Sequence, residues 1–396
     1  MGRYVKSIKD PIHGYIELSQ AELEVVDTLP LQRLRRIKQL PGSEYVYPGA
    51  MNTRFEHSLG VMHLAGLMGR KIAEHSGDDV IPLLRMSGLL HDVGHGPFSH
   101  SFEPLLNSVI GMSHEEMSAF LIRETEISDI LGRNGMDVGD ITELIEGVHP
   151  RRSLSRIINS SVDADKMDYT VRDSYHTGAG YSVDIHRIAL NSMEVGGDLV
   201  INMRALEAVE SLLMARLLSF RTVYYHKTSR AVQLMLEMAM RSISHKLALE
   251  EVLGDPQAYL ELDDYTMWEV LKREEESREI MRRLMRRHIL KVAKEWYGLS
   301  LQPEEVNELR EEISRISGVR EEEIVVDAPK IEFIKSTDLP MLWREGELID
   351  PLEASPVLSR LRDLFPAMVR VYTWPAHREK VKSALYRKTP QDLLRG

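Results

Sequence analysis

The chain of 396 residues contains no cysteine. This absence excludes disulfide bonds, a cysteine nucleophile, thiolate zinc sites and iron–sulfur clusters, so a metal would have to sit on histidine and carboxylate side chains. No apolar run approaches the roughly 18–20 residues of a membrane span. The first residues, MGRYVKSIKDP, lack the apolar segment of a secretion signal. We therefore expect a cytoplasmic protein with no membrane partner.

Positive charge is in the minority as well. Lys and Arg number 50 against 61 Asp and Glu, which gives a formal net charge of −11. This acidity argues against a protein that coats nucleic acid, although it is compatible with a local basic pocket. Hydrophobic residues make up 43% of the chain. A sizeable core is therefore expected, and a disordered chain is excluded.

The chain divides into three parts by its residue patterns. Residues 1–18 predict an N-terminal arm with a turn and a short strand, residues 19–250 a helical domain, and residues 251–396 a lobe that is first helical and then α+β. The expected fold class is mainly α, a helical bundle with a smaller C-terminal α+β lobe. Expected helices span residues 163–176, 204–227, 229–247 and 264–298, and expected strands span 199–201, 322–333 and 367–373.

Histidines gather in one short segment. His91, His95, His100 and His114 all fall within 24 of the 396 residues. The sequence HDVGHGPFSH directly follows an apolar helix, so His91 and Asp92 project two types of ligand from the end of that helix. His95 follows His91 by four residues and stays on the same side of a continued turn. The Gly and Pro residues then break the helix and allow a ligand close to the backbone.

A metal ion needs more ligands than one His–Asp pair. His57 stands in RFEHS at the start of a helix, and Asp165 stands in VDADKMDY on another. With His91 and Asp92 they offer two imidazoles and two carboxylates, which suits one divalent ion of Mn, Fe, Zn or Ni and leaves positions for water and substrate. Mg is less favoured because it prefers oxygen ligands. Each motif taken singly is also compatible with a purely structural role.

The expected helix 163–176 carries a polar stripe. One face holds Asp165, Tyr169, Arg172, Asp173 and His176. Polar groups on an inward face are costly unless they are paired, so the helix by itself favours a solvent-exposed face with ion pairs. Beside a metal site, and with Lys166 next to it, the stripe instead predicts a wall of cationic and hydroxyl groups for a phosphorylated ligand.

Long blocks of the sequence resemble a known family. These blocks are KDPIHGYIEL, LQRLRRIKQLPG, YVYPGAMNTRFEHS, HDVGHGPFSH and VDADKMDYTVRD, within roughly residues 4–230. They resemble the HD-domain deoxynucleoside triphosphate triphosphohydrolases, above all the branch that joins an HD domain to a sterile-alpha-motif domain. The resemblance implies an HD-domain helical bundle and a metal-dependent hydrolysis at the α-phosphate, which releases a deoxynucleoside and intact triphosphate.

The resemblance also implies roles for single residues. It assigns the metal to His57, His91, Asp92 and Asp165. It assigns catalysis to His95 and His114 beside the α-phosphate, to His100 near the leaving oxygen, and to Glu103, which stands where the family has Asp; Glu115 is placed to orient an imidazole. It assigns the triphosphate to Arg54, Lys166, Tyr169 and Arg216, and the sugar to Gln39, Asp173 and Tyr224. Phe220 and Tyr225 depart from the family's His and Gln, which puts the base and sugar preference in doubt.

A regulatory site is implied in the same way. In the family a guanine nucleotide binds at subunit contacts and promotes an active oligomer, and the matching residues are Lys6, Asp27, Gln32 and Arg35. The expected partners are therefore deoxynucleoside triphosphates, a GTP or dNTP activator, and further copies in a dimer or tetramer. The alternative is that Asp27, Arg33, Arg35 and Arg36 form ordinary ion pairs along one helix.

Two other functions stay open at this point. An HD phosphohydrolase acting on nucleoside monophosphates or cyclic phosphodiesters would use the same metal ligands. A non-catalytic binder of nucleotides or single-stranded nucleic acid would need only the cationic pocket. The basic stripe MRRLMRRH at residues 281–288 fits nucleic acid, but the preceding EEESRE favours ion pairs within the helix.

Overall fold

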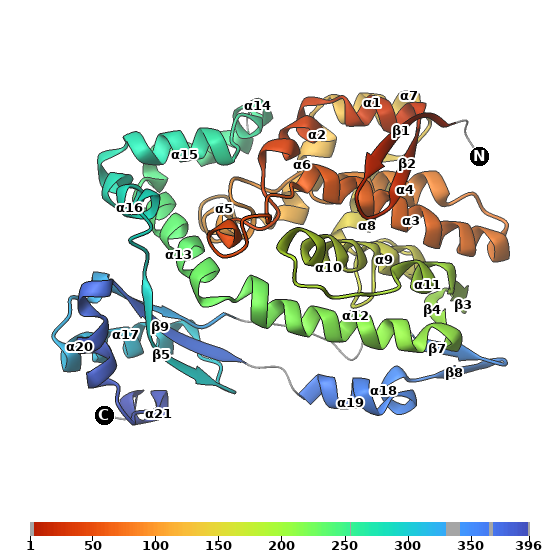
Figure 1. Cartoon of the computed structure of the whole chain (residues 1–396). Coiled ribbons are helices and arrows are strands. Elements are labelled where there is room, and N and C mark those ends of the chain that lie inside the picture. The colour runs from red at the N-terminus through yellow and green to blue at the C-terminus, as the bar shows by residue number, and fades with distance from the viewer. Residues whose placement is uncertain (1–3, 254, 330–340, 364–366, 395–396) are drawn as a thin grey trace.

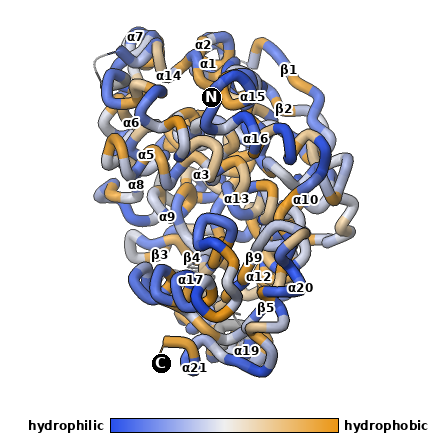
Figure 2. Tube along the Cα trace, turned by 90° about the vertical axis from the view of Figure 1, so that its left-hand side faces the viewer, coloured by the Kyte–Doolittle hydropathy of each residue, from blue (hydrophilic) through white to orange (hydrophobic). Residues whose placement is uncertain are grey.

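The computed structural model describes residues 4–253, 255–329, 341–363 and 367–394 (Figure 1). The fold is mainly α with a smaller α+β part, as the sequence predicted. Among the described residues, no helix is both long and apolar enough to cross a membrane. Hydrophobic and hydrophilic residues alternate along the trace (Figure 2), which is typical of amphipathic helices that bury one side.

A β-hairpin precedes the helical bundle. The elements of this first part are β1 (Tyr4–Asp10), β2 (Gly14–Ser19), α1 (Gln20–Val26), α2 (Leu29–Arg33), α3 (Arg54–Ser76), α4 (Ile81–Leu90), α5 (Glu103–Ile110), α6 (His114–Glu124), α7 (Glu126–Arg133), α8 (Val138–Glu146), α9 (Arg152–Ile158), α10 (Ala164–Thr177), α11 (Ile185–Leu190), β3 (Ser192–Val195), β4 (Asp198–Asn202), α12 (Leu206–Ser219) and α13 (Lys227–Ser242). The backbones of α3 and α4 approach closely, because a Cβ added at Gly88 would lie 3.1 Å from the backbone nitrogen of Met62.

The chain after residue 250 packs in more than one place. Its elements are α14 (Pro256–Leu260), α15 (Asp264–Arg273), α16 (Glu275–Met285), β5 (Lys291–Tyr297), α17 (Pro303–Ser317), β6 (Ile324–Asp327), β7 (Met341–Arg344), β8 (Glu347–Ile349), α18 (Pro351–Ala354), α19 (Pro356–Asp363), β9 (Met368–Thr373), α20 (Arg378–Ala384) and α21 (Pro390–Leu394). Met267 and Met281 of α15 and α16 join the core of the bundle through α13. The strand β7 pairs in parallel with β4.

A small sheet organises the remaining lobe, at the lower left of Figure 1. Strand β9 lies between β5 and β6 and is antiparallel to both. Helices α17, α20 and α21 contribute Leu309, Val381 and Leu393 to a separate hydrophobic cluster on this sheet. The helices up to about residue 290 share the core of the bundle. The domain boundary expected near residue 250 stays a prediction.

Two expected helices were too long. The helix expected over residues 264–298 ends at Met285, and Lys291–Tyr297 is the strand β5. This stretch, KVAKEWY, carries Val, Trp and Tyr and gains main-chain pairing with β9, which decides the conformation. The helix expected over 204–227 breaks at a π-helical turn, Phe220–Tyr224. The expected strand 367–373 is confirmed as β9, and the expected strand 322–333 corresponds to β6, with residues 330–333 outside the described part.

Candidate active site

Three helix ends meet at one point of the bundle. Helix α3 begins with a capping box between Thr53 and Glu56, which places His57 in its first turns. Helix α4 ends at Leu90, so His91 and Asp92 follow in the next turn. Helix α10 is capped by Asp163, whose side chain accepts the backbone N–H of Lys166. These caps fix where each helix starts or stops and thereby aim its polar side chains at one place.

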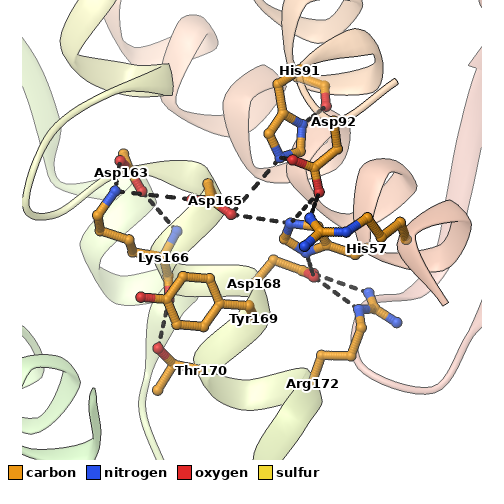
Figure 3. A network of polar contacts seen from close by, with 12 residues as sticks. His57, His91, Asp92, Asp163, Asp165, Lys166, Asp168, Tyr169, Thr170 and Arg172 are labelled. Carbon is orange, nitrogen blue, oxygen red and sulfur yellow. Dashed lines mark hydrogen bonds and ion pairs between the residues drawn. The ribbon is translucent and has the colours of Figure 1, made fainter. Parts of the chain in front are cut away.

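The four predicted metal ligands converge there (Figure 3). Nε2 of His57 lies 3.0 Å from Oδ1 of Asp165 and 3.7 Å from Oδ2 of Asp92. Nε2 of His91 lies 3.3 Å from Oδ1 of Asp92 and 3.8 Å from Oδ1 of Asp165. Ligand atoms that bind one ion at about 2.0–2.2 Å lie about 3 Å from one another. The structure therefore brings together residues that are up to 108 positions apart in the chain.

The two imidazoles are oriented as metal ligands are. Nδ1 of His91 donates to the carbonyl of Gly88 at 2.9 Å, which leaves the lone pair on Nε2. That Nε2 atom is buried and has no hydrogen-bond partner among the described residues. Nδ1 of His57 donates to Oδ2 of Asp168 at 2.8 Å. A second hydrogen bond on the far nitrogen is the usual support of a metal-bound histidine, so these residues fit a divalent ion.

Two carboxylates, Asp92 and Asp165, stay ionised at this point. Burial penalises the charge of Asp92, yet Arg54 beside it holds the pKa of that carboxyl well below its usual range. Burial also penalises the charge of Asp165, but the nearby His57 and His91 lower the pKa of that carboxyl strongly. For His57 burial opposes protonation, but Asp165 and Asp168 raise its pKa to about 10. The field of these carboxylates favours a cation between them.

Asp168 is a residue that the sequence analysis missed. Besides His57, it accepts Nε2 of His13 at 2.6 Å and Nε of Arg172 at 2.8 Å. Gly60 makes room for it, since a Cβ there would lie 1.9 Å from Oδ1 of Asp168. Arg172 was expected to face a phosphorylated ligand, and this was wrong. It binds Asp168 and, at 2.8 Å, Asp10, because these two buried carboxylates require a cation.

The four residues His57, His91, Asp92 and Asp165, which we call the quartet, adjoin a pocket of about 500 Å³. The predicted residues on its wall are Gln39, Arg54, Asp92, His95, His100, Glu103, His114, Glu115, Asp165, Lys166, Tyr169, Asp173 and Tyr224. The departures Phe220 and Tyr225 also line it. Arg230 and Gln233 of α13 line it too and were not predicted, because α13 showed only its apolar periodicity in the sequence. A pocket of this size and polarity suits a small charged molecule.

Glu103 links three histidines at one end of the pocket. Its Oε1 atom lies 2.6 Å from Nδ1 of His114, 3.0 Å from Nδ1 of His100 and 3.9 Å from Nδ1 of His95. Burial opposes the charge of Glu103, but His100 and His114 lower its pKa far more. Burial likewise opposes protonation of His114, and Glu103 raises its pKa. The side chain of Glu103 is one methylene longer than the Asp of the resembling family, and it contacts both His100 and His114.

His95 is held differently from its neighbours. Its ring stacks on that of His114 with the centroids 4.0 Å apart, and neither ring nitrogen has a hydrogen-bond partner among the described residues. Burial and the charge of Arg54 lower the pKa of His95 well below its usual range. It is thus a neutral imidazole with free polar atoms beside the quartet. Glu115 lies 3.3 Å from Nε2 of His114 and contacts the other side of that ring.

A buried acid, Asp173, also lines the pocket. Asp173 accepts the hydroxyl of Tyr224 and the side-chain amide of Asn52, each at 2.8 Å. Burial raises the pKa of Asp173 to about 6, against the effect of these two hydrogen bonds. Oε1 of Gln39 is buried and has no partner among the described residues. Asn52 was not predicted, because a lone Asn in a loop gives no signal in the sequence.

The cationic side chains are anchored by protein groups. Arg54 donates to Asp92 and, at 2.7 Å, to the hydroxyl of Ser99, and its Nη2 atom is buried with no partner among the described residues. Lys166 donates to Asp163 at 2.7 Å. Arg216 does not line the pocket but donates to the hydroxyl of Tyr169 at 3.1 Å from behind. Arg54 and Lys166 therefore present their charge to the pocket directly.

The predicted regulatory residues lie apart from this pocket. Lys6 on β1, Asp27 after α1 and Arg35 after α2 are exposed. Arg35 donates to Oε1 of Gln32 at 2.9 Å, and its guanidinium lies 3.6 Å from the ring centroid of Phe55.

The alternative of ordinary ion pairs along one helix is wrong for two of its four members. Arg33 is buried and donates to the carbonyl of Leu262 at 2.8 Å, and Arg36 pairs with Asp263. Both partners stand more than 200 positions further along the chain. The two arginines therefore connect residues 33–36 to the segment just before α15.

Comparison with known proteins bears on the same residues. A profile of the HD domain matches residues 54–173, and a profile of the HD associated region matches residues 183–388. The chain belongs to the HD-domain family. The first match begins at the start of α3 and ends on α10, so it contains all four residues of the quartet.

Relatives extend the match over most of the chain. A protein of Methanocaldococcus jannaschii, MJ1154, is 37% identical over 292 residues, which are 72% of this chain and 59% of that protein. The deoxynucleoside triphosphate triphosphohydrolase SAMHD1 homolog of Dictyostelium discoideum is 30% identical over 354 residues, 83% of this chain and 68% of that protein. The chain thus spans about three-fifths of the first of these relatives. A crystal structure of a protein from Aquifex aeolicus is similar with a TM-score of 0.81 at 29% identity and covers 96% of this chain and 99% of its own.

Proposed function

We propose that this protein hydrolyses deoxynucleoside triphosphates at the α-phosphate and releases a deoxynucleoside and intact triphosphate. The observation that carries the proposal is the quartet of His57, His91, Asp92 and Asp165, which fits a metal and opens into a pocket with cationic walls. The similarity to a triphosphohydrolase of Dictyostelium discoideum supports the substrate class. Fold similarity by itself would support neither.

The quartet would hold one divalent ion of the Mn, Fe, Mg, Zn or Ni type. Such an ion lowers the pKa of a bound water and polarises a phosphoryl oxygen. Arg54 and Lys166 neutralise the negative charge of the triphosphate, and Tyr169 gives it a hydroxyl donor that Arg216 holds from behind. The neutral ring of His95 has one N–H, which donates to an α-phosphate oxygen.

The proton for the leaving group comes from the histidines around Glu103. Attack of water on the α-phosphorus forms one P–O bond and breaks the bond to the 5′-oxygen, which must take up a proton to leave as a hydroxyl. His100 delivers this proton, and Glu103 contacts Nδ1 of both His100 and His114, so that it can relay a proton from His114 to His100. Of the two protons of the attacking water, one restores the histidine pair and the other leaves to solvent, so that the products are deoxynucleoside and triphosphate.

Another group of side chains on the pocket wall, Asp173, Gln39 and Tyr224, would bind the sugar. Asp173 and Gln39 accept or donate hydrogen bonds at the 3′-hydroxyl, and the ring of Tyr224 packs on the sugar where a 2′-hydroxyl would stand. The base then meets the wall that contains Phe220 and Tyr225. A binding site with a buried acid discriminates strongly against ligands that leave this acid unpaired.

We further propose that the protein acts in the cytoplasm as a dimer or tetramer that a guanine nucleotide promotes. Lys6 and Arg35 would bind its phosphates, Asp27 the N1–H and amino edge of guanine, and Gln32 a further polar group. The exposure of Lys6, Asp27 and Arg35 supports a site that a second copy of the chain completes.

Chromatography of the products tests the proposal. The protein is incubated with each deoxynucleoside triphosphate and Mn²⁺ or Mg²⁺, with and without GTP, beside the double variant His91→Ala/Asp92→Ala. Deoxynucleoside and triphosphate in equal amounts, absent with the variant, are expected. Monophosphate with pyrophosphate, stepwise loss of phosphate, or faster hydrolysis of monophosphates or cyclic dinucleotides would contradict the proposal. Binding of nucleotide with no turnover under any condition would indicate a binder.

A further inference from the structure

Three histidines from distant parts of the chain meet outside the pocket. His13 lies in the turn between β1 and β2, His63 lies on α3 and His186 is the second residue of α11. One ring nitrogen of each lies within 4.8 Å of those of the other two. The ring centroids are 5.1 Å apart for His13 and His63 and 5.9 Å apart for His13 and His186. None of the three lines the pocket of the quartet.

His13 is fixed in place by two aspartates. Oδ1 of Asp10 accepts the backbone N–H of His13 at 2.8 Å, which sets the turn. Nε2 of His13 donates to Oδ1 of Asp168 at 2.6 Å, so the lone pair stands on Nδ1. The side chain of His13 has 0% exposure, and its Nδ1 atom has no hydrogen-bond partner among the described residues. A buried acceptor without a partner costs free energy that a bound cation would recover.

We propose that His13, His63 and His186 form a second metal site that binds zinc or another divalent ion with a preference for imidazole. Three imidazoles with water in the fourth position are an established tetrahedral ligand set for such ions. Ring nitrogens bound to one zinc ion lie about 3.4 Å apart, so the site closes by small side-chain rotations. The carboxylate of Asp168 behind His13 supplies the support that metal-bound histidines normally have.

The charges around this cluster are compatible with a cation. Burial lowers the pKa of His63 to about 4, with smaller contributions from His13 and Arg85, and burial also lowers the pKa of His186. Both imidazoles are thus neutral near pH 7 and keep a lone pair. The Nε atom of Arg85 donates to Glu22 at 2.6 Å, and this carboxylate neutralises its charge. Asp168 behind the cluster and Asp184 beside His186 favour a cation.

Metal stoichiometry tests the site without reference to activity. The full chain is stripped with a chelator and dialysed against Zn²⁺, and bound zinc is counted by mass spectrometry. The variant His91→Ala/Asp92→Ala removes the quartet and should retain one equivalent. Adding His186→Ala should remove this equivalent and weaken zinc binding by at least about 100-fold. Adding His245→Ala instead, an exposed histidine far along the chain, should leave it bound.

The wild-type background gives an independent arm. There the exposed His186 can be replaced with both sites otherwise intact, and His186→Ala should lower the zinc content by one equivalent. Co²⁺ in place of Zn²⁺ should give the visible absorption of a tetrahedral site in the His91→Ala/Asp92→Ala protein. Equal zinc content with and without His186, or a cooperatively melting His91→Ala/Asp92→Ala protein that binds no zinc, would overturn the proposal.

Discussion

Nδ1 of His57 donates a hydrogen bond to Asp168 at 2.8 Å. The other oxygen of the same carboxylate accepts Nε2 of His13 at 2.6 Å. One buried side chain therefore orients an imidazole of the quartet and an imidazole of the histidine cluster. The two imidazoles bind the two oxygens of one carboxylate. A change in the position of Asp168 would therefore affect both proposed metal sites.

Asp168→Asn should weaken metal binding at the quartet by about 10–100-fold. An amide has one acceptor oxygen instead of two. Donors of His57, His13 and Arg172 face both oxygens of Asp168, so the amide nitrogen meets a donor in either orientation and disturbs the support of His57. Calorimetric titration of the stripped protein with Mn²⁺ measures the change. Asp129→Asn on the exposed face of α7 is the matched control and should bind as the wild type does. Unaltered Mn²⁺ affinity in Asp168→Asn would show that the hydrogen bond does not support the metal.

Glu103→Gln should move the alkaline limb of the kcat–pH profile to lower pH. Glu103 raises the pKa of His114, so the protonated imidazole persists above its ordinary value of about 6.5. Without the negative charge of Glu103 the pKa of His114 falls, so His114 loses its proton at lower pH. Glu103→Asp shortens the reach but keeps the charge, and should shift the limb less.

The same pair has a signature in stability. A histidine whose folded pKa is raised stabilises the fold below its unfolded value, and this contribution is lost as the pH rises through the folded value. The stability difference between wild type and Glu103→Gln should therefore be largest at acidic pH, measured by denaturant unfolding above pH 5. A difference that is constant from pH 5 to 9 would argue against the pairing.

Tyr224→Ala should reduce the preference for dATP over ATP by at least about 10-fold, because the ring no longer occupies the space of a 2′-hydroxyl. Tyr224→Phe keeps the ring and should keep the preference. It removes a hydrogen bond that lowers the pKa of Asp173, so that pKa rises above its present value of about 6. Its KM should then increase more steeply than that of the wild type as the pH falls from 8 to 6. Equal discrimination in all three proteins would place the sugar elsewhere.

Arg216→Ala should lower kcat/KM for triphosphates by about 10–100-fold, chiefly through KM. Arg216 donates to the hydroxyl of Tyr169 and to the carbonyl of Ser161 at 3.0 Å, so it positions Tyr169 on the pocket wall. Arg216→Lys keeps the charge but cannot make both bonds, and should lose nearly as much. Full activity of the Lys variant would show that charge, and not positioning, is what Arg216 provides.

GTP should shift the protein to larger assemblies in sedimentation experiments, and Arg35→Ala should abolish the shift. Arg35 is exposed and donates to Gln32, and its guanidinium is the group that we propose to bind a nucleotide phosphate. Arg133→Ala, which removes an exposed arginine of α7 that pairs with Glu24, is the control and should assemble normally. Sedimentation that is indifferent to GTP, or an Arg35→Ala protein that still responds, would contradict the regulatory site.

The positions of the four candidate metal ligands could be predicted from the sequence, whereas the residues that hydrogen-bond to the site could not. The motifs around His57, His91 and Asp165 each stand at a helix end, and such positions are readable from capping residues and periodicity. The roles of Asp168 and Asn52 could not be predicted, because their hydrogen bonds form only when α10 packs against α3 and the loop before α3. The cluster of His13, His63 and His186 escaped for the same reason.

Local pattern also misjudged conformation where partners decide it. Lys291–Tyr297 follows a charged helix and looks like its continuation, yet it pairs with β9, more than 70 positions further along. The polar stripe of α10 was real, but Arg172 uses its charge on Asp168 and Asp10 and not on a ligand. A face can be recognised from spacing, whereas the partner of each group on it requires the tertiary structure.

Hydrolysis of dGTP in ¹⁸O-labelled water tests the central claim most directly. Attack at the α-phosphorus places one ¹⁸O atom in the released triphosphate and none in deoxyguanosine, and mass spectrometry of both products reads this in one experiment. The account predicts singly labelled triphosphate that disappears with His91→Ala/Asp92→Ala. Label in deoxyguanosine, or in orthophosphate or pyrophosphate formed directly from dGTP, would contradict it.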